Sequence, residues 1–346
     1  WDPNDGYTAT LQRLRIERGQ TPPGAPFEDS GAGILAPGGG AWQATSLVVV
    51  DCEFTNNHAV TEAQDSGGGA IYAIGLDRLV LADCVFEGNT GSNGGAVYSL
   101  GSREVIITDS TFLGNTATGD DGNPGNGGNG GALGVDGAAR TVRVCGTFFR
   151  NNTANAYGAG FFSVMYDDSS LTEFVGCSFE GNLNPTTDQF GGGAYIQGGP
   201  FSVRDTLFQA NEANGVGALF LGPAATGDLT NCTFTQNIAR EALAGAISVN
   251  TDRPVEMVNC TIVDNHAPGE FAFAAGINVG EDNELRIRNT ILAGNTGGNV
   301  WNPWNIRRTV LDGGGNLQWP ETRPNGQSEP PATAGVVWAE PMLLPV

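Results

Sequence analysis

One short pattern recurs along the chain and constrains the fold more than any other feature. A Phe-x-x-Asn segment is followed a few residues later by Gly-Gly-Ala and an apolar residue, as at 86–89 and 94–97. The Asn that ends this segment recurs at intervals of 32, 26, 37, 30, 29, 26, 28 and 30 residues. The nine positions are Asn57, Asn89, Asn115, Asn152, Asn182, Asn211, Asn237, Asn265 and Asn295. Such self-similarity is typical of a stack of equivalent units.

Alignment on this asparagine shows two columns in which every residue is apolar. The column three residues before it holds Phe54, Phe86, Phe112, Phe149, Phe179, Phe208, Phe234, Ile262 and Leu292. The column eight residues before it holds Val49, Leu81, Ile107, Val144, Phe174, Val203, Leu229, Met257 and Ile287. Alternation of apolar and polar residues around both columns predicts short strands with one buried face.

The fold follows from the number of strands in each repeat. An Asp or Asn six residues before the repeated asparagine suits a bend between the first two strands, and the Gly-Gly-Ala half supplies a third. Three short strands in about 30 residues predict an all-β fold, a right-handed parallel β-helix of about ten coils with capped ends. Like residues then stack on like, about 4.8 Å apart. We expect the asparagine amides to form a structural ladder, because the corner backbone lacks strand partners.

The repeat also predicts how the chain is divided. We expect residues 1–30 to form an irregular N-terminal cap, residues 31–317 the parallel β-helix, and residues 318–346 a Pro-rich C-terminal tail. The tail either leads toward a further segment or lies along the rod. The chain begins without a Met, and we expect it to be the ordered part of a longer precursor.

Charge and hydropathy exclude several classes of partner. The formal net charge is -21, from 16 Lys plus Arg against 37 Asp plus Glu, which disfavours nucleic acid and anionic membranes. No apolar run approaches the length of a membrane span, so we expect no direct membrane insertion in this segment. Cationic partners and divalent metals stay open.

The cysteines follow the repeat and do not suggest a disulfide framework. Five of the six stand five residues before the repeated asparagine, which predicts a column of small, buried, reduced thiols: Cys52, Cys84, Cys177, Cys232 and Cys260. A bridge between Cys232 and Cys260 is the open alternative. Asn231 and Asn259 each begin a glycosylation sequon, and we expect both to be buried at a bend.

The paired motifs resemble the repeats of polymorphic outer membrane proteins and other right-handed β-helix repeat proteins of bacterial surfaces. Full pairs occur at 68–71 with 86–89, at 94–97 with 112–115 and at 192–195 with 208–211. The pattern departs at Ile262 and Leu292, which replace Phe, and at Ala275, which replaces Gly. The resemblance implies secretion, surface display, and a role in adhesion or as a scaffold. The membrane barrel of such proteins has no counterpart in these 346 residues.

The outward face of the strands is where catalysis would be sought, because several polysaccharide lyases and hydrolases are β-helices. The weak catalytic candidates on it are Glu173, Arg204, Asp228 and Glu256. Asp228 and Glu256 fall on successive coils, at a spacing near that of the two carboxylates of a retaining glycosidase. A calcium-assisted lyase with an arginine base is a second option. The alternative favoured here is a solvated ladder of paired charges, with Arg143 beside Glu173.

Metal ligands are sparse. Asp120 and Asp121 lie in a long Gly/Asn-rich loop and are the weak candidates for a metal site, with calcium the ion that would suit them. The loop lacks the alternating acids of a calcium-binding loop, and no cofactor is expected.

Three functions remain. The leading hypothesis is a non-catalytic protein, secreted or on the bacterial cell surface, that acts in adhesion or as a scaffold. It would bind other surface proteins or glycans through the loops between the asparagine and Gly-Gly-Ala, whose lengths vary. The second is a polysaccharide lyase or glycoside hydrolase that uses the charged strand face. The third is a self-assembling subunit of a surface filament or layer.

Overall fold

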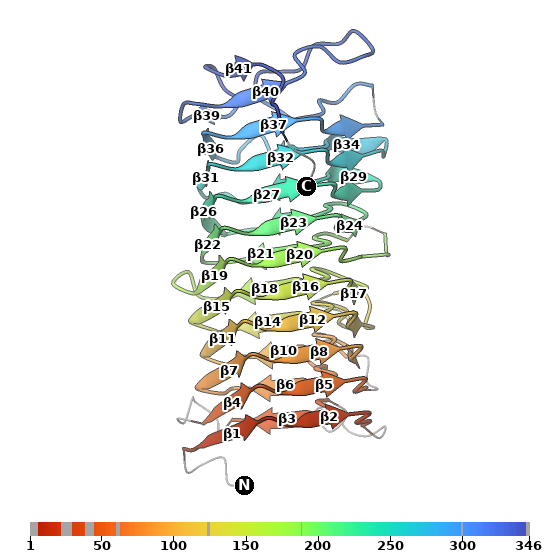
Figure 1. The fold of residues 1–346 in the computed structure, drawn as a ribbon, viewed down its shortest axis with the longest axis vertical. Helices are drawn as coiled ribbons and strands as arrows, with labels where there is room; N and C mark the ends of the chain where they lie inside the picture. Colours follow the sequence, from red (N-terminus) through yellow and green to blue (C-terminus); the bar gives the residue numbers. More distant parts are fainter. Residues whose placement is uncertain are drawn as a thin grey trace.

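The computed structural model describes residues 6–21, 30–38, 45–59, 63–122, 125–187, 189–298 and 300–343, and within them the chain winds into a tall stack of coils (Figure 1). Three parallel sheets of 11, 12 and 9 strands run the length of the stack. None of the described residues is helical. The predicted fold class, a parallel β-solenoid with three short strands per coil, is therefore confirmed.

Each sheet collects one strand from successive coils. The eleven-stranded sheet contains β1 (Thr8–Gln12), β4 (Ser46–Val50), β7 (Arg78–Ala82), β11 (Glu104–Thr108), β15 (Thr141–Cys145), β19 (Leu171–Val175), β22 (Pro200–Arg204), β26 (Thr226–Thr230), β31 (Val255–Val258), β36 (Leu285–Arg288) and β39 (Leu311–Asp312). The twelve-stranded sheet contains β2 (Arg15–Glu17), β5 (Glu53–Thr55), β8 (Val85–Glu87), β12 (Thr111–Leu113), β16 (Phe148–Arg150), β20 (Ser178–Glu180), β23 (Leu207–Gln209), β27 (Thr233–Thr235), β32 (Thr261–Val263), β37 (Ile291–Ala293), β40 (Leu317–Trp319) and β41 (Val337–Trp338).

The third sheet and three smaller ones complete the coils. The nine-stranded sheet contains β3 (Ile34–Pro37), β6 (Ile71–Ile74), β10 (Val97–Leu100), β14 (Leu133–Gly137), β18 (Phe161–Met165), β21 (Ala194–Gln197), β25 (Leu219–Leu221), β30 (Ile247–Val249) and β35 (Ile277–Val279). The smaller sheets contain β9 (Thr90–Gly91), β13 (Thr116–Ala117) and β17 (Thr153–Ala154); β24 (Glu212–Ala213), β28 (Ile238–Ala239), β33 (His266–Ala267) and β38 (Thr296–Gly297); and β29 (Ala242–Ala244) with β34 (Phe271–Ala274).

The apolar columns fill the interior of the stack. Every residue in the two apolar columns, three and eight positions before the repeated asparagine, is 0% exposed. Successive phenylalanines from Phe54 to Phe234 stack in register, with ring centroids 4.6 to 5.1 Å apart and planes within 10°. This spacing is that of neighbouring strands, so the rings follow the strand ladder and pack in offset stacks.

The nine repeated asparagines form one continuous buried ladder. The Asn115 Nδ2 donates to Asn152 Oδ1 at 2.9 Å and to the Phe86 carbonyl at 3.0 Å, and its backbone N–H donates to the same Asn152 Oδ1 at 2.9 Å. The Asn115 Oδ1 accepts two bonds from Asn89 in turn. The Asn115 amide thereby satisfies corner backbone of the preceding coil, and its own backbone N–H is satisfied by the asparagine of the next coil, which is what a buried turn requires.

A left-handed residue makes the first corner of each coil. The residue six positions before the ladder asparagine has φ between 48° and 63° in all nine coils: Asp51, Asp83, Asp109, Gly146, Gly176, Asp205, Asn231, Asn259 and Asn289. Gly, Asn and Asp tolerate this conformation best. The side chains of Asn231 and Asn259 are exposed at this corner, so the expectation that both sequons are buried is wrong. In the left-handed conformation the side chain points away from the packed interior.

The cysteines lie on the inner side of the same corner and hydrogen-bond its backbone. All six are free, and the five in the repeat column are buried. The Cys84 Sγ donates to the Ala82 carbonyl at 3.1 Å, and Thr206, in the same column, donates its hydroxyl to the Arg204 carbonyl at 2.8 Å. Burial raises the pKa of Cys84 to about 11, against the hydrogen bonds that lower it. The Cys84 thiol is therefore a protonated donor to the corner carbonyl.

The solenoid begins earlier than predicted. Strands β1 and β2 pair in register with β4 and β5. The Gly19 N–H donates to Asn57 Oδ1 at 2.9 Å, the bond that the backbone of a ladder asparagine makes in the later coils. The expected boundary at residue 31 is thus wrong for residues 6–21, which form the first coil. Those residues lack both halves of the repeat and keep only its alternation. Residues 1–5 and 22–29 of the predicted cap lie outside the described part of the chain.

The C-terminal segment is also more structured than predicted. Residues 318–346 were expected to be a tail, but β41 pairs with β40, and Ala332 and Thr333 are fully buried. An ion pair of 3.0 Å joins Arg323 and Glu329, whose side chains are 4% and 0% exposed. Glu329 also accepts the backbone N–H groups of Trp304 and Asn305. This part of the chain therefore closes the final coils, as a stacked sheet requires at its end.

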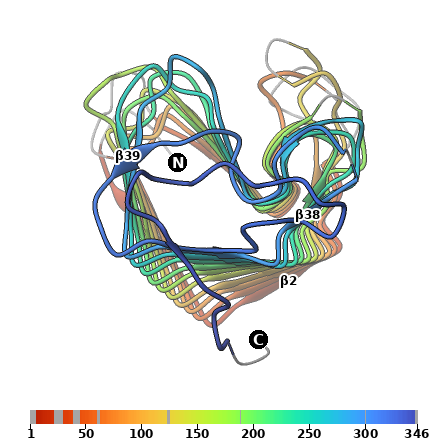
Figure 2. The ribbon, with the colours of Figure 1, turned by 90° about the horizontal axis from the view of Figure 1, so that it is seen from above.

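The loops of the stack gather on one side. Seen from above, two sets of loops project from the two ends of the nine-stranded sheet toward the same side (Figure 2). One set follows the ladder asparagines and includes residues 118–122 and 125–132; the other joins the nine-stranded to the eleven-stranded sheet and includes residues 166–170. We call these the long wall and the short wall. The outer face of the nine-stranded sheet is the floor between them.

We expect the asparagine ladder to dominate stability. Asn115→Leu removes the acceptor of two Asn89 donors and the donor to the Phe86 carbonyl, all buried, so it should lower the free energy of unfolding by at least about 3 kcal/mol. Asn126→Leu is the matched control, because Asn126 is exposed and its side chain bonds only the exposed Asp120, and it should change stability by about 0.5 kcal/mol or less. Denaturant midpoints measure both, and equal shifts would refute the role given to the ladder.

Candidate functional site

The charged face of the eleven-stranded sheet is a ladder of paired side chains. Strand register places Arg143, Glu173, Ser202, Asp228 and Glu256 on successive coils. Glu173 lies 3.1 Å from Arg143 and 3.6 Å from Arg204, while the Ser202 hydroxyl lies 3.3 Å from the Asp228 carboxylate. The structure thus brings Glu173 and Arg204 together as an ion pair and places Asp228 beside Glu256 in register. Such partly exposed pairs contribute little energy.

The candidate metal ligands lie in the long wall. Asp120 and Asp121 are exposed, and Asp120 Oδ1 accepts a bond of 3.0 Å from Asn126. Within the described ranges, no three His, Cys, Asp or Glu side chains come close enough together to hold a metal ion.

Nothing in the described part of the chain forms a helix that would cross a membrane.

A second aromatic column runs along the outer face of the nine-stranded sheet. It was not predicted from the sequence. Strand register aligns its members in the order Tyr72, Tyr98, Gly134, Phe162, Tyr195 and Phe220. Tyr72 stacks on Tyr98 at 5.6 Å, and Tyr195 on Phe220 at 5.0 Å. Part of the signal was present in the sequence, because Tyr72 and Tyr98 each follow the first inward residue after Gly-Gly-Ala, at 68–70 and 94–96. A strand alternates, so that position faces outward.

These outward aromatics attach the long wall to the floor. Phe162, Tyr195 and Phe220 form a small core of their own with Val216, separate from the interior of the stack, and Tyr157 and Phe190 of the long wall pack against it. Phe190 stacks on Phe220 at 5.0 Å, and Tyr157 lies 4.9 Å from Tyr195. Burial of this apolar surface fixes the position of the long-wall loops beside the floor.

A hollow of about 280 Å³ opens between the floor and the two walls. The floor supplies Asp136, Phe162, Val164, Tyr195 and Gln197; the long wall supplies Tyr157 and the loop before β6 supplies Gln64; and the short wall supplies Tyr166. We call this hollow the tyrosine pocket. The described residues that line it include three phenols, two amides and one carboxylate, and no Lys or Arg.

The polar groups of the tyrosine pocket are held in place by one another. The Tyr98 hydroxyl donates to Asp136 Oδ2 at 3.4 Å, and the Tyr195 hydroxyl donates to Gln197 Oε1 at 2.7 Å. Asp136 is 2% exposed, whereas Tyr166, which also hydrogen-bonds Asp136, is 72% exposed. The pocket therefore has a buried negative group at its base and an accessible aromatic ring at its edge.

Comparison with known families now places the chain. A family model described as the right handed beta helix region matches residues 27–222, more than half of the 346 residues. The chain belongs to the right-handed β-helix family. Beyond residue 222 the same three sheets continue to β39, β41 and β35. No curated protein and no solved structure matches the chain. The family match supports the β-helix fold only. The more specific resemblance to polymorphic outer membrane proteins stays a prediction.

The phenols of this β-helix protein are held in the neutral form. Desolvation, the Asp136 charge and the hydrogen bond to Asp136 raise the pKa of Tyr166 to about 12. Burial also raises the pKa of Tyr157 and of Tyr195 above the usual value. All three rings therefore present uncharged faces and hydroxyl donors at neutral pH.

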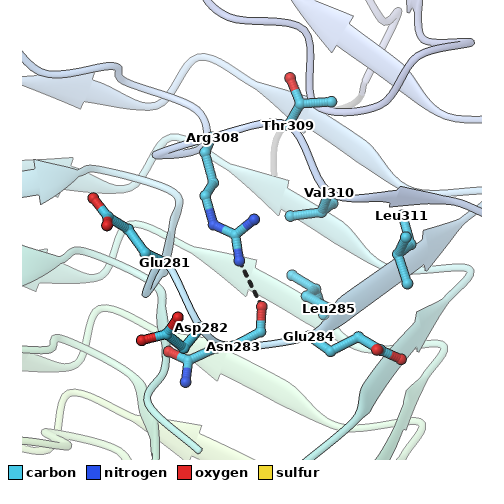
Figure 3. A pocket seen from close by; sticks show the side chains of 9 residues that line it. All are labelled: Glu281, Asp282, Asn283, Glu284, Leu285, Arg308, Thr309, Val310 and Leu311. Carbon is cyan, nitrogen blue, oxygen red and sulfur yellow. Dashed lines mark hydrogen bonds between the residues drawn. The ribbon is translucent and has the colours of Figure 1, made fainter. Parts of the chain in front are cut away.

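A larger hollow near the C-terminal end is a packing feature of a turn. It measures about 390 Å³ and is lined by residues 281–285 and 308–311 (Figure 3). Arg308 donates to the Gly280 carbonyl at 2.7 Å and to the Asn283 carbonyl at 2.5 Å. The guanidinium of Arg308 therefore serves to hydrogen-bond the backbone carbonyls of this turn. We place the candidate functional site in the tyrosine pocket instead.

The Tyr166–Asp136 contact makes a testable prediction about titration. The difference in phenolate absorbance between the wild type and Tyr166→Phe should show one tyrosine that ionises near pH 12. Because the folded protein holds this proton more tightly than the unfolded chain, the contact stabilises the fold fully below pH 10 and loses its effect as pH rises to 12. Asp136→Asn should lower the pKa of Tyr166. A Tyr166 that ionised near pH 10 in the folded wild type would contradict the contact.

Proposed function

We propose that this β-helix protein is a non-catalytic binding protein, secreted or displayed on a cell surface, that holds an extended glycan chain in the cleft above the nine-stranded sheet. The observation that carries the proposal is the tyrosine pocket, which is open between two walls of loops and joins an accessible phenol ring to fixed amides and a carboxylate. Adhesion or a scaffold role would follow from such binding.

The chemistry of the pocket suits sugars. A pyranose ring offers apolar C–H faces and a rim of hydroxyls, so an aromatic face and convergent polar groups recognise it together. Tyr166 supplies an accessible ring, and Gln64 and Gln197 supply amides that both donate and accept. Phe220, the next residue of the outer column after Tyr195, is covered by Phe190, so a glycan chain would make its contacts with the floor at the pocket itself.

The charged face supports a binding role over a catalytic one. The candidate acids Glu173, Asp228 and Glu256 lie on the eleven-stranded sheet, away from the residues of the pocket, and Glu173 is shared between two guanidinium groups. The carboxylate of Glu173 is thus engaged by side chains of the protein itself. The hydrolase or lyase remains the competing hypothesis, and the same experiment decides between the two.

The test uses an array of soluble oligosaccharides of neutral, amino and uronic sugars, followed by calorimetry on those that bind. We expect at least one class to bind, and Tyr166→Ala to weaken that binding at least tenfold, because Tyr166 is the accessible ring of the pocket. Glu256→Gln is the matched control on the charged face and should bind as the wild type does. Unchanged binding by Tyr166→Ala would overturn the assigned site. Release of shortened sugars, lost in Glu256→Gln, would favour the enzyme.

A further inference from the structure

We propose that the tyrosine pocket selects a glycan whose sugars carry protonated amino groups, over neutral sugars and over uronic acids. The inference rests on the proposed function, which it narrows to one class of ligand. It follows from the arrangement of the rings, the charge beneath them and the residues that line the pocket.

The ring of Tyr166 provides a face for a cation, and the packed rings of Tyr157 and Tyr195 form the opposite side of the pocket. Tyr157 and Tyr195 lie together on one side, with centroids 4.9 Å apart, and Tyr166 comes from the short wall on the other. An ammonium group is attracted to the face of an aromatic ring, and the attraction strengthens where water is displaced. Tyr166 is 72% exposed and so has a face free for a ligand, while a hollow of about 280 Å³ leaves room for a small alkylammonium group.

The one charged side chain among the described residues that line the pocket is negative. The Asp136 carboxylate lies at the base, and Asp65 is close enough that its charge also raises the pKa of Tyr166. None of the described lining residues is cationic. The whole chain carries a formal charge of -21, so its field concentrates cations near the surface. A charge at the base of a partly dry pocket acts more strongly than one in water.

The same charges reject the opposite ligand. A uronic acid would bring its carboxylate toward Asp136 with no described cation in the lining to receive it, which costs like-charge repulsion and desolvation. A neutral sugar would use the Tyr166 ring and the amides but would gain no attraction from the negative charge of Asp136. The amino sugar is the class that uses both features of the pocket.

The first experiment isolates the charge with two small probes of nearly the same shape. Choline carries a trimethylammonium group, and 3,3-dimethylbutan-1-ol is its uncharged carbon counterpart. We expect the wild-type protein to bind choline at least tenfold more tightly by calorimetry. Tyr166→Phe keeps the ring and should retain that preference, whereas Tyr166→Leu should lose it. Equal affinity for the two probes would overturn the inference.

The role of Asp136 is tested separately, because it is buried. Asp136→Asn keeps the size and the hydrogen-bonding capacity of the side chain, and should weaken choline binding at least fivefold with no change for the alcohol. Circular dichroism and the melting temperature establish that the variant is folded, and the Tyr166 variants answer the question where it is not. A folded Asp136→Asn that bound choline as the wild type does would overturn the part assigned to the carboxylate.

The second experiment identifies the source of the amine. Oligomers of glucosamine, of N-acetylglucosamine and of glucose share a similar backbone, and only the first is cationic at neutral pH. Binding of the glucosamine oligomer at least tenfold more tightly than both others supports the inference. Binding of glucose oligomers with no preference for amines leaves the proposed function standing and overturns this inference alone. Preference for oligolysine over every sugar would assign the pocket to a protein partner and overturn it, and failure of all sugars to bind would overturn the proposed function itself.

Discussion

Each ladder asparagine serves two coils at once, and this shared amide is the constraint on which the rest of the structure depends. Its oxygen accepts two bonds from the asparagine of one neighbouring coil, and its amide donates to the other neighbour and to a phenylalanine carbonyl. All these groups are buried, so a slip of one residue would leave several of them without partners, at a cost of about 1–3 kcal/mol each. The ladder therefore fixes the register of every coil, and the phenylalanine and aliphatic columns stack because the asparagines do.

Fixing the corner leaves the chain free elsewhere. The intervals between ladder asparagines range from 26 to 37 residues, yet strands before and after the corner keep the same pairing in each coil. The extra residues emerge as loops at the two ends of the nine-stranded sheet, on one side of the rod (Figure 2). Walls of variable length are thus a consequence of a core that does not vary, and the pocket lies where those walls face each other across a rigid floor.

The same distinction explains what the sequence could predict. Columns at fixed distances from an asparagine predict strands and a core, because repetition makes each position visible nine times. Residues 6–21 and 320–338 carry no such repeat, so they were not assigned to the solenoid, although β1, β2 and β41 complete the ladders at the two ends. The charged face was predicted because it belongs to a repeated strand. The tyrosine pocket was not, because Gln64, Tyr157 and Tyr166 come from loops whose positions depend on packing.

The pocket occupies the place where the outer aromatic column is interrupted. Strand β14 contributes Gly134 between Tyr98 and Phe162, and a Cβ there would lie 3.0 Å from the Tyr98 ring. Two positions further along the strand it contributes Asp136, where the next coils have Val164 and Gln197. In the rest of the column the rings stack face to face, so their faces are not free for a ligand. One coil without a ring and with a carboxylate therefore changes a packing surface into a polar recess, with Tyr166 at its edge.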